Sequence, residues 1–218
     1  KSLTSGEGGA IITDNQTAYE DAFAYHHIGR GMQAATYDHT TVGPNYRLTE
    51  FQGAALRTQL QKLQAQTETR MKNVDELFRL LADIPGLDRL KPDTRITQRG
   101  FYFVIVRYLQ DKMNGLHRDA FLNALRAEGM PVGHGYGRPV YQLPAFAEGS
   151  FGKKGCPISC GFYGKDVDYA KLHRPNVEHI CANEQITIPQ TFFVHDENIP
   201  LLADGFHRVF EQLDTLSA

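Results

Sequence analysis

The stretch Lys1-Ser2-Leu3-Thr4-Ser5-Gly6-Glu7-Gly8-Gly9, followed by the apolar run Ala10–Thr13, is the most informative part of the chain. Lysine suits carbonyl chemistry, because a desolvated amine beside other cations loses its proton and becomes a nucleophile. The glycines permit backbone conformations that other residues avoid, and they let a bulky ligand approach closely. We expect a short buried strand over 10–13. An ordinary glycine-rich turn beside a solvated lysine is the alternative interpretation.

A second informative stretch is Gly43-Pro44-Asn45-Tyr46-Arg47-Leu48-Thr49-Glu50-Phe51-Gln52-Gly53-Ala54. An amide donor, an arginine fork and the N-terminus of a helix together are suited to binding an anion. Thr49 and Gln52 have the spacing of a capping box, which predicts that a helix begins there. The alternative is a loop before a capped helix, with Arg47 solvated.

These two stretches, in this order, resemble the DegT/StrS-type sugar aminotransferases, which are fold-type-I enzymes that use pyridoxal phosphate (PLP). The resemblance implies that Lys1 is the catalytic residue and carries PLP as a Schiff base. It also implies that Asn45 contacts the PLP phosphate of a neighbouring subunit, which requires a homodimer. Tyr46 and Arg47 are assigned to substrate binding. Family members with histidine in place of this lysine carry out dehydration, so Lys1 favours amino transfer.

A third stretch, Gly129-Met130-Pro131-Val132-Gly133-His134-Gly135-Tyr136, continues through Arg138-Pro139-Val140-Tyr141 to Pro144-Ala145-Phe146. It is similar to the family pattern "G-I-P…H-Y-P-L-Y…P-A-F". The resemblance places His134 and Tyr136 near the substrate, and a histidine in such a loop can donate to a hydroxyl, a phosphate or a carboxylate. Gly135 and Gly137 are additions to the family pattern. A surface histidine in a turn is the alternative.

The resemblance covers nearly the whole chain and implies an α/β fold, namely the C-terminal portion of a fold-type-I PLP-dependent transferase starting at the cofactor lysine. We expect a remnant of the large PLP-binding domain over 1–48, a long linking helix over 49–84 and a small C-terminal α/β domain over 85–218. In the family, the other half of the fold supplies the aspartate facing the pyridine nitrogen, the group stacked on the ring and several phosphate donors.

Hydrophobic spacing and cap signals predict the local elements. Asp14 is a plausible N-cap for a helix to about Ile28, closed by Gly29. A helix over 49–84 would span about 54 Å at 1.5 Å per residue, so we expect a bend or break in it. Phe101–Tyr108 is apolar on both faces and predicts a central strand. Further expected elements are a helix over 119–128, a strand over 185–189 and a helix beginning near Ile199.

Composition limits the classes of function. The chain has 218 residues, of which 41% are hydrophobic and 22% charged, which is typical of a soluble globular protein. A formal net charge of -2 gives no reason to expect nucleic acid or an anionic membrane as a partner. No apolar run approaches the roughly 20 residues of a membrane helix. Three cysteines do not make a disulfide framework, so we expect a cytoplasmic protein.

Five possible metal ligands fall within one window: Cys156, Cys160, His173, His179 and Cys181. Their spacing is Cys-x3-Cys and then His-x5-His-x-Cys, which matches no familiar tetrahedral zinc site. We therefore expect no metal site, and we interpret the cysteines as loop and core residues.

The leading hypothesis is a PLP-dependent aminotransferase that transfers an amino group from glutamate or glutamine to a keto-sugar or keto-cyclitol. The stretch Glu184–Gln190 is similar to family members that act on keto-cyclitols or modified sugars. A second hypothesis is a truncated, catalytically silent domain that dimerises through the Asn45 loop and the long helix. A PLP-containing regulator or a PLP lyase sharing the fold is the third, because a fold alone does not decide a function.

Overall fold

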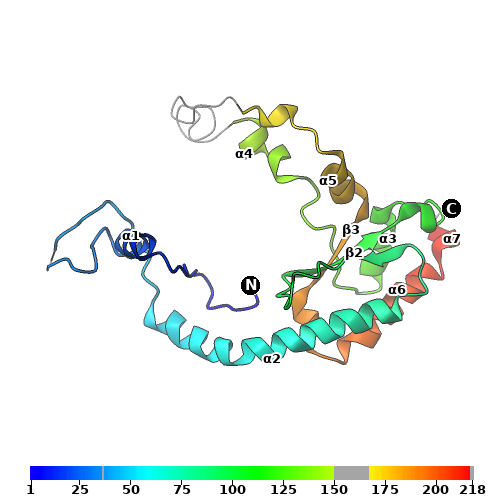
Figure 1. The fold of residues 1–218 in the computed structure, drawn as a ribbon. Helices are drawn as coiled ribbons and strands as arrows, with labels where there is room; N and C mark the ends of the chain where they lie inside the picture. Colours follow the sequence, from blue (N-terminus) through cyan, green and yellow to red (C-terminus); the bar gives the residue numbers. More distant parts are fainter. Residues whose placement is uncertain (36, 150–166, 217–218) are drawn as a thin grey trace. The chain divides into compact units, whose positions relative to one another are not determined.

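The computed structural model describes residues 1–35, 37–149 and 167–216. The chain divides into two compact units, unit 1 over Lys1–Ala65 and unit 2 over Gln66–Ala218. Helix α2 (Glu50–Leu80) contributes residues to both units (Figure 1). Each unit is described by itself below.

Unit 1 contains helix α1 (Gln16–His26) and the start of α2. The side chain of Asn15 accepts a hydrogen bond from the Ala18 N–H at 3.0 Å, so Asn15 and not Asp14 is the N-cap of α1. The expected closure by Gly29 is confirmed, since its N–H donates to the Ala24 carbonyl at 2.8 Å. The φ of Gly29 is +85°, a conformation that favours glycine.

The strand expected over 10–13 is wrong. The side chains of Ile11 and Ile12 are 77% and 96% exposed, and the segment has no regular structure. A strand needs a neighbour that completes its backbone hydrogen bonds, and no segment in the described part of unit 1 pairs with residues 10–13. The apolar run is therefore an exposed extended segment.

Helix α2 begins with the predicted capping box. The Thr49 N–H donates to Gln52 Oε1 at 3.0 Å, and the Gln52 N–H donates to Thr49 Oγ1 at 3.3 Å. The expected break is wrong, because residues Glu50–Leu80 form one continuous helix of 31 residues (Figure 1). The helix contains no proline, and its one glycine, Gly53, lies in the first turn.

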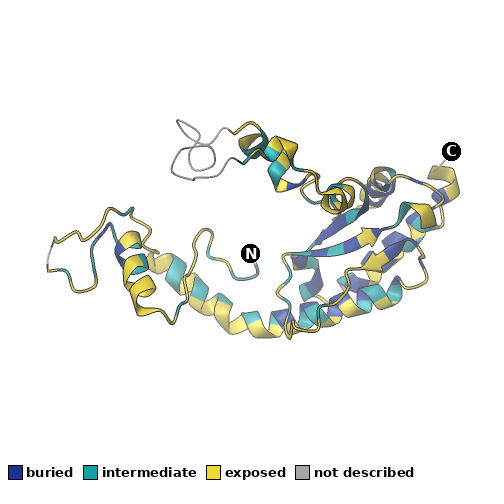
Figure 2. Cartoon of the chain, turned by 45° about the horizontal axis from the view of Figure 1, so that its top comes forward, coloured by how far each residue is buried: buried dark blue, intermediate teal, exposed yellow. Residues whose placement is uncertain are grey.

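Unit 2 is built on a three-stranded antiparallel sheet of order β1-β2-β3, formed by Leu87–Arg89, Phe103–Tyr108 and Gln185–Pro189. The predicted central strand and the strand over 185–189 are confirmed. Burial on both faces is wrong for β2, since fully buried residues alternate with less buried ones and Arg107 is exposed. Figure 2 shows the buried residues of this unit gathered on the strands and the adjoining helices. The strand is buried on one face only, because the helices that share the hydrophobic cluster with the sheet cover that face.

The hydrophobic core of unit 2 lies between the sheet and helices α2, α3 (Arg118–Ala127) and α6 (Asn198–Phe210). The expected helix over 119–128 is confirmed as α3, and Gly129 follows it with a φ of +78°. The expected C-terminal helix is confirmed as α6. The largest fully buried side chains include Tyr108, Phe121, Phe193, Phe206, Leu77 and Leu81.

The remaining elements are short: η1 (Gln110–Lys112), η2 (Val140–Gln142), α4 (Pro144–Ala147), η4 (Tyr169–Lys171), α5 (Pro175–His179), the π-turn η5 (Ile180–Glu184), η6 (Gln190–Val194) and α7 (Leu213–Leu216). Cys156 and Cys160, two of the possible metal ligands named from the sequence, lie outside the described residues. No described helix has both the length and the apolar character needed to cross a membrane.

Candidate active site

The first sequence motif forms an irregular segment at the start of unit 1. Lys1 is exposed. The Gly6 N–H donates to Thr4 Oγ1 at 3.3 Å, and Gly6 has a φ of +89°. Gly8 has a φ of +151°. Both glycines adopt conformations that L side chains rarely reach, which is the reason the sequence has glycine at these positions.

The second motif is held by its own side chains and by helix α1. Asn45 Oδ1 accepts hydrogen bonds from Arg47 Nε at 2.9 Å and from the Arg47 N–H at 3.3 Å. The Tyr46 N–H donates to the His26 carbonyl at 2.9 Å. The Tyr46 ring lies edge-on to Tyr25, with the centroids 6.2 Å apart, and remains 68% exposed. The Asn45 oxygen therefore orients the Arg47 guanidinium.

The two motifs meet in unit 1. Gln52 Nε2 donates to the Glu7 carbonyl at 2.7 Å, across 45 residues of sequence. A Cβ added at Gly8 would lie 3.2 Å from Leu48 Cδ1, so the backbone of the first motif runs close to the side chain of the second. Gln52 thus caps α2 and anchors the glycine-rich segment at the same time.

An open cavity of about 820 Å³ lies at this junction. Its lining combines the glycine-rich segment, one side of α1 and the second motif: Glu7, Gly8, Gly9, Ala10, Ile11, Tyr19, Ala22, Phe23, Tyr25, His26, Tyr46, Arg47, Leu48 and Gln52. Burial, and then the positive charges of Arg47 and Arg30, lower the pKa of the neighbouring His27. Arg47 is the one arginine or lysine among the described residues that line the cavity.

The residues of this cavity suit a ligand with an apolar body and an anionic end. The mostly apolar walls can accept a planar ring, and the guanidinium of Arg47 can pair with a phosphate or a carboxylate. Tyr46 and Arg47 are brought together here with the glycines of the first motif. Asn45 is hydrogen-bonded to Arg47 Nε, and neither Asn45 nor Lys1 is among the lining residues.

His134 and Tyr136 belong to unit 2, where both are exposed. They lie in a loop with two glycines of positive φ, Gly135 at +69° and Gly137 at +73°. A Cβ added at Gly135 would lie 2.6 Å from Gln185 Cδ, so the loop runs against the start of β3. The extra glycines therefore permit a tight turn that presents the histidine and the tyrosine to solvent.

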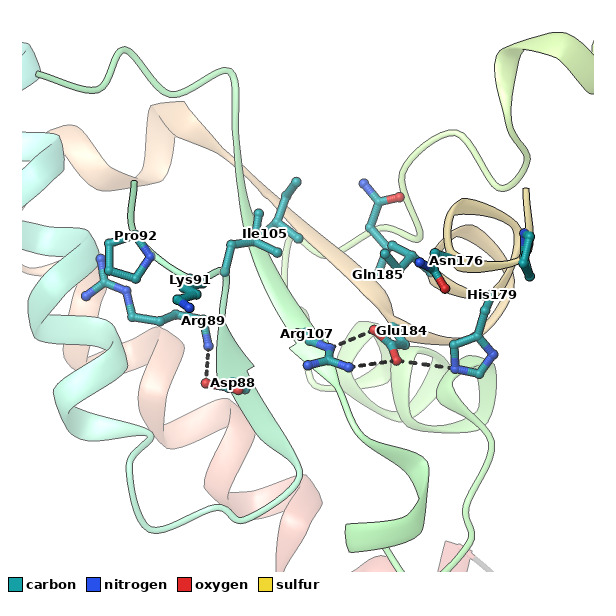
Figure 3. A pocket seen from close by; sticks show the side chains of 13 residues that line it. Asp88, Arg89, Lys91, Pro92, Ile105, Arg107, Asn176, His179, Glu184 and Gln185 are labelled. Atoms are coloured by element: carbon teal, nitrogen blue, oxygen red, sulfur yellow. Dashed lines mark hydrogen bonds and ion pairs between the residues drawn. The ribbon is translucent and has the colours of Figure 1, made fainter. Parts of the chain in front are cut away.

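Sequence reasoning missed an ion-pair cluster on the outward face of the sheet in unit 2 (Figure 3). Glu184 accepts hydrogen bonds from Arg107 Nε at 2.7 Å and Nη2 at 3.1 Å, and its Oε1 lies 3.2 Å from His179 Nε2. The Arg107 hydrogen bonds lower the pKa of Glu184. The cluster borders an open cavity of about 1010 Å³. Its only sequence signal was the single charged residue, Arg107, within an apolar strand.

The comparisons with known proteins agree with the motifs. The sequence model of the DegT/DnrJ/EryC1/StrS aminotransferase family matches residues 1–183. A Micromonospora echinospora protein, provisionally named as an L-glutamine:3-amino-2,3-dideoxy-scyllo-inosose aminotransferase, is 30% identical over 99% of this chain and 52% of its own length. The 3-amino-5-hydroxybenzoate synthase of Amycolatopsis mediterranei is 34% identical over 84% of this chain and 44% of its own length.

The fold matches solved structures as well. The crystal structure of a 3-amino-5-hydroxybenzoic acid (AHBA) synthase aligns with a TM-score of 0.74 and 27% identity, covering 97% of this chain and 52% of that protein. The chain thus spans about half the length of the relatives it matches. Its mixed α/β architecture is that of the C-terminal portion of a fold-type-I aminotransferase. The chain belongs to the DegT/DnrJ/EryC1/StrS aminotransferase family.

Proposed function

We propose that the protein is a PLP-dependent aminotransferase that moves an amino group from glutamine or glutamate to a keto-cyclitol or keto-sugar. The observation that carries the proposal is the family match over residues 1–183, together with a relative named for glutamine as donor and an inosose as acceptor. The meeting of the two sequence motifs at one cavity supports it, because a cofactor enzyme must gather the residues that hold the cofactor.

The donor set of unit 1 fits PLP. Lysine is the residue whose side-chain amine condenses with the aldehyde of PLP, and Lys1 supplies such an amine. Arg47, oriented by Asn45 Oδ1 at 2.9 Å, offers a charge-assisted donor for a phosphate. PLP, when bound, supplies the electron sink for amino transfer. In this proposal Lys1 would hold the cofactor and move the proton, while the Asn45–Arg47 pair would hold the anionic end of the cofactor bound to the partner subunit.

Exposed polar side chains in each unit, taken separately, are the proposed contacts of the acceptor. Tyr46 and Arg47 in unit 1 and His134 and Tyr136 in unit 2 are exposed and can donate hydrogen bonds to the hydroxyl groups of a cyclitol or a sugar. Side chains of this kind favour a polyhydroxylated acceptor over an apolar one. An apolar acceptor would leave the polar groups of the site without hydrogen-bond partners, which costs binding free energy.

We further propose that the protein is a homodimer in which the Asn45 segment faces the partner subunit. The segment and the start of α2 expose several large apolar side chains, with Val42 93%, Tyr46 68% and Phe51 90% exposed. Exposed apolar side chains that gather in one segment are typical of an interaction surface. A catalytically silent domain that dimerises through the same surface is the alternative.

The first test is cofactor binding by the purified protein. PLP should produce a new absorbance band, and borohydride reduction should fix the cofactor on Lys1, as peptide mapping by mass spectrometry would show. Lys1→Arg keeps the positive charge but should abolish the reduced adduct. Lys112→Arg, at an exposed lysine of unit 2, is the matched control that should leave the adduct intact.

The second measurement is amino transfer from glutamine, with a keto-cyclitol, a keto-sugar and an apolar 2-oxo acid offered separately. Transfer to either of the first two supports the proposal. A protein that binds PLP at Lys1 and transfers to none of them would favour a regulator or a lyase sharing the fold. A protein that gives no adduct at Lys1 would instead favour the silent, dimerising domain.

A further inference from the structure

The loop His134–Arg138 of unit 2 leaves the sheet from a fixed point. The Gly133 N–H donates to the Thr187 carbonyl at 2.9 Å, and the Thr187 N–H donates back to the Gly133 carbonyl at 2.7 Å. Thr187 Oγ1 adds a third hydrogen bond to the same carbonyl at 3.1 Å. Residue 133 is therefore fixed to β3, and the loop that follows runs past the Gln185 side chain at Gly135 before it reaches its next anchor.

The next anchor along the chain is Tyr141, in η2. Its hydroxyl donates a hydrogen bond to Oε1 of Glu178, in α5. The same Oε1 accepts from the Arg174 N–H at 2.8 Å, and Oε2 lies 2.8 Å from His173 Nδ1. Glu178 thus holds three partners, and its side chain is only 23% exposed. The aromatic rings of Phe146 in α4 and Tyr169 in η4 form a neighbouring contact, with their centroids 5.5 Å apart.

The charges at this second anchor favour a phenol paired with a carboxylate. The backbone hydrogen bond from Arg174, followed by that from Tyr141, lowers the pKa of Glu178. Burial, followed by the hydrogen bond to Glu178, raises the pKa of Tyr141. The proton therefore stays on the tyrosine at neutral pH, and the contact is a charge-assisted hydrogen bond, which is stronger than a neutral one.

The loop between the two anchors has little stiffness of its own. Gly135 and Gly137 both have positive φ values and lower the cost of alternative backbone conformations. The segment has neither strand nor helix from His134 to Pro139. The direction in which His134 and Tyr136 point therefore depends on how the two ends of the loop are held.

We propose that Glu178 is a positioning residue that acts through Tyr141 to fix the loop carrying His134 and Tyr136, and so sets how these two side chains meet the acceptor. The role in acceptor binding rests on the proposed aminotransferase function. The anchoring of the loop does not, because it follows from the contacts of unit 2 alone. The two parts can be tested separately on the same variants.

Tyr141→Phe is the decisive variant, because it removes one hydroxyl and leaves the ring. Tyr169→Phe is its matched control: it removes the hydroxyl of the tyrosine that packs on Phe146, and this hydroxyl makes no hydrogen bond within the described residues. Both variants of the purified, PLP-treated protein are compared by amide hydrogen exchange. Tyr141→Phe should speed exchange about tenfold over 134–141 and leave β2 and β3 unchanged, whereas Tyr169→Phe should match the wild type.

Kinetics test the acceptor role. Tyr141→Phe should raise the KM for the keto acceptor about tenfold, the factor expected for one charge-assisted hydrogen bond. The rate of amino-group uptake from glutamine, measured without acceptor, should not change. A purely structural defect would instead slow amino-group uptake from glutamine as well as raise the acceptor KM. Glu178→Gln keeps one acceptor oxygen for Tyr141 and should lie between the wild type and Glu178→Leu in acceptor KM.

The outcomes separate the two ideas. Wild-type protein that transfers no amino group would overturn the proposed function, and hydrogen exchange would still decide whether Glu178 anchors the loop. Active protein in which Tyr141→Phe and Tyr169→Phe exchange alike and share one acceptor KM would overturn the positioning role. Faster loop exchange with an unchanged acceptor KM would overturn the link between the loop and the acceptor.

Discussion

The two units of this chain are stabilised in different ways. In the described part of unit 1, Ala24 is the one buried apolar side chain, while Ile12 and Phe51 are at least 90% exposed. Unit 2 buries a contiguous hydrophobic cluster between its sheet and three helices. Unit 1 is instead held by turns, caps and single hydrogen bonds such as that from Gln52 to Glu7. An apolar side chain therefore marks a core in one unit and an open surface in the other.

The largest expected effect contrasts one phenylalanine from each unit. Phe206, in α6, is fully buried, and Phe206→Ala should lower the free energy of unfolding by about 3–5 kcal/mol, because it removes buried surface and leaves a cavity. Phe51→Ala should change it by less than about 0.5 kcal/mol in dilute protein. Urea denaturation followed by circular dichroism measures both. A large loss for Phe51→Ala at high protein concentration only would mean that a second subunit covers this surface.

The next effect concerns Glu184, whose side chain is 10% exposed. Its folded pKa lies below the unfolded value, chiefly because Arg107 donates hydrogen bonds to it. The contribution of the Glu184 carboxylate to the free energy of unfolding is therefore present above the unfolded pKa, and it is lost as the pH falls through the folded pKa. Glu184→Gln should cost about 2 kcal/mol at pH 7, the range for a hydrogen bond to a charged group.

The pH profile distinguishes this role from simple packing. The difference in unfolding free energy between wild type and Glu184→Gln should shrink steadily as the pH falls from 7 to 3. Asp93→Asn is the control, because Asp93 pairs with Arg95, whose side chain is 89% exposed. It should have little effect at any pH. A cost of Glu184→Gln that does not depend on pH would show that the carboxylate charge contributes nothing.

Local signals in the sequence predicted local structure well. The Thr49–Gln52 capping box, the glycine after α1 and strand β3 all depend on residues within a few positions of one another. The Arg107–Glu184 pair was missed because its members are 77 residues apart, and no spacing rule links them. The exposure of Ile11 and Ile12 was missed because hydrophobicity alone does not say whether a partner is present.

In the candidate site, too, the local motifs were predicted and the contacts between distant residues were not. The meeting of the glycine-rich segment with the Asn45 segment is consistent with the resemblance that linked them, but the hydrogen bond from Gln52 to Glu7 was not foreseen. The roles of Lys1, Asn45, Tyr46, Arg47, His134 and Tyr136 stay predictions, as do domain limits near residues 48 and 84. Side-chain roles in a cofactor site depend on contacts that a sequence does not encode locally.

The smallest effect tests whether turns really hold unit 1. Gly29 and Gly6 both have positive φ, at +85° and +89°, so alanine is conformationally unfavourable at either position. The two positions differ in the room available for a methyl group. A Cβ at Gly29 would lie 1.9 Å from the Thr41 carbonyl oxygen, whereas a Cβ at Gly6 would have no described atom beyond its adjacent residues within 4 Å. Gly29→Ala must therefore also displace the loop that follows α1.

Hydrogen exchange at the Tyr46 amide, which donates to the His26 carbonyl, reports on that loop. Gly29→Ala should speed its exchange about tenfold, equivalent to about 1.4 kcal/mol of local opening, and Gly6→Ala should leave it unchanged. The amides of β2 should not respond to either substitution, because the core of unit 2 does not depend on this turn. If Gly29→Ala leaves the Tyr46 amide protected, then contacts other than the turn hold the Asn45 segment, and the contrast between the two units would be smaller than their burial suggests.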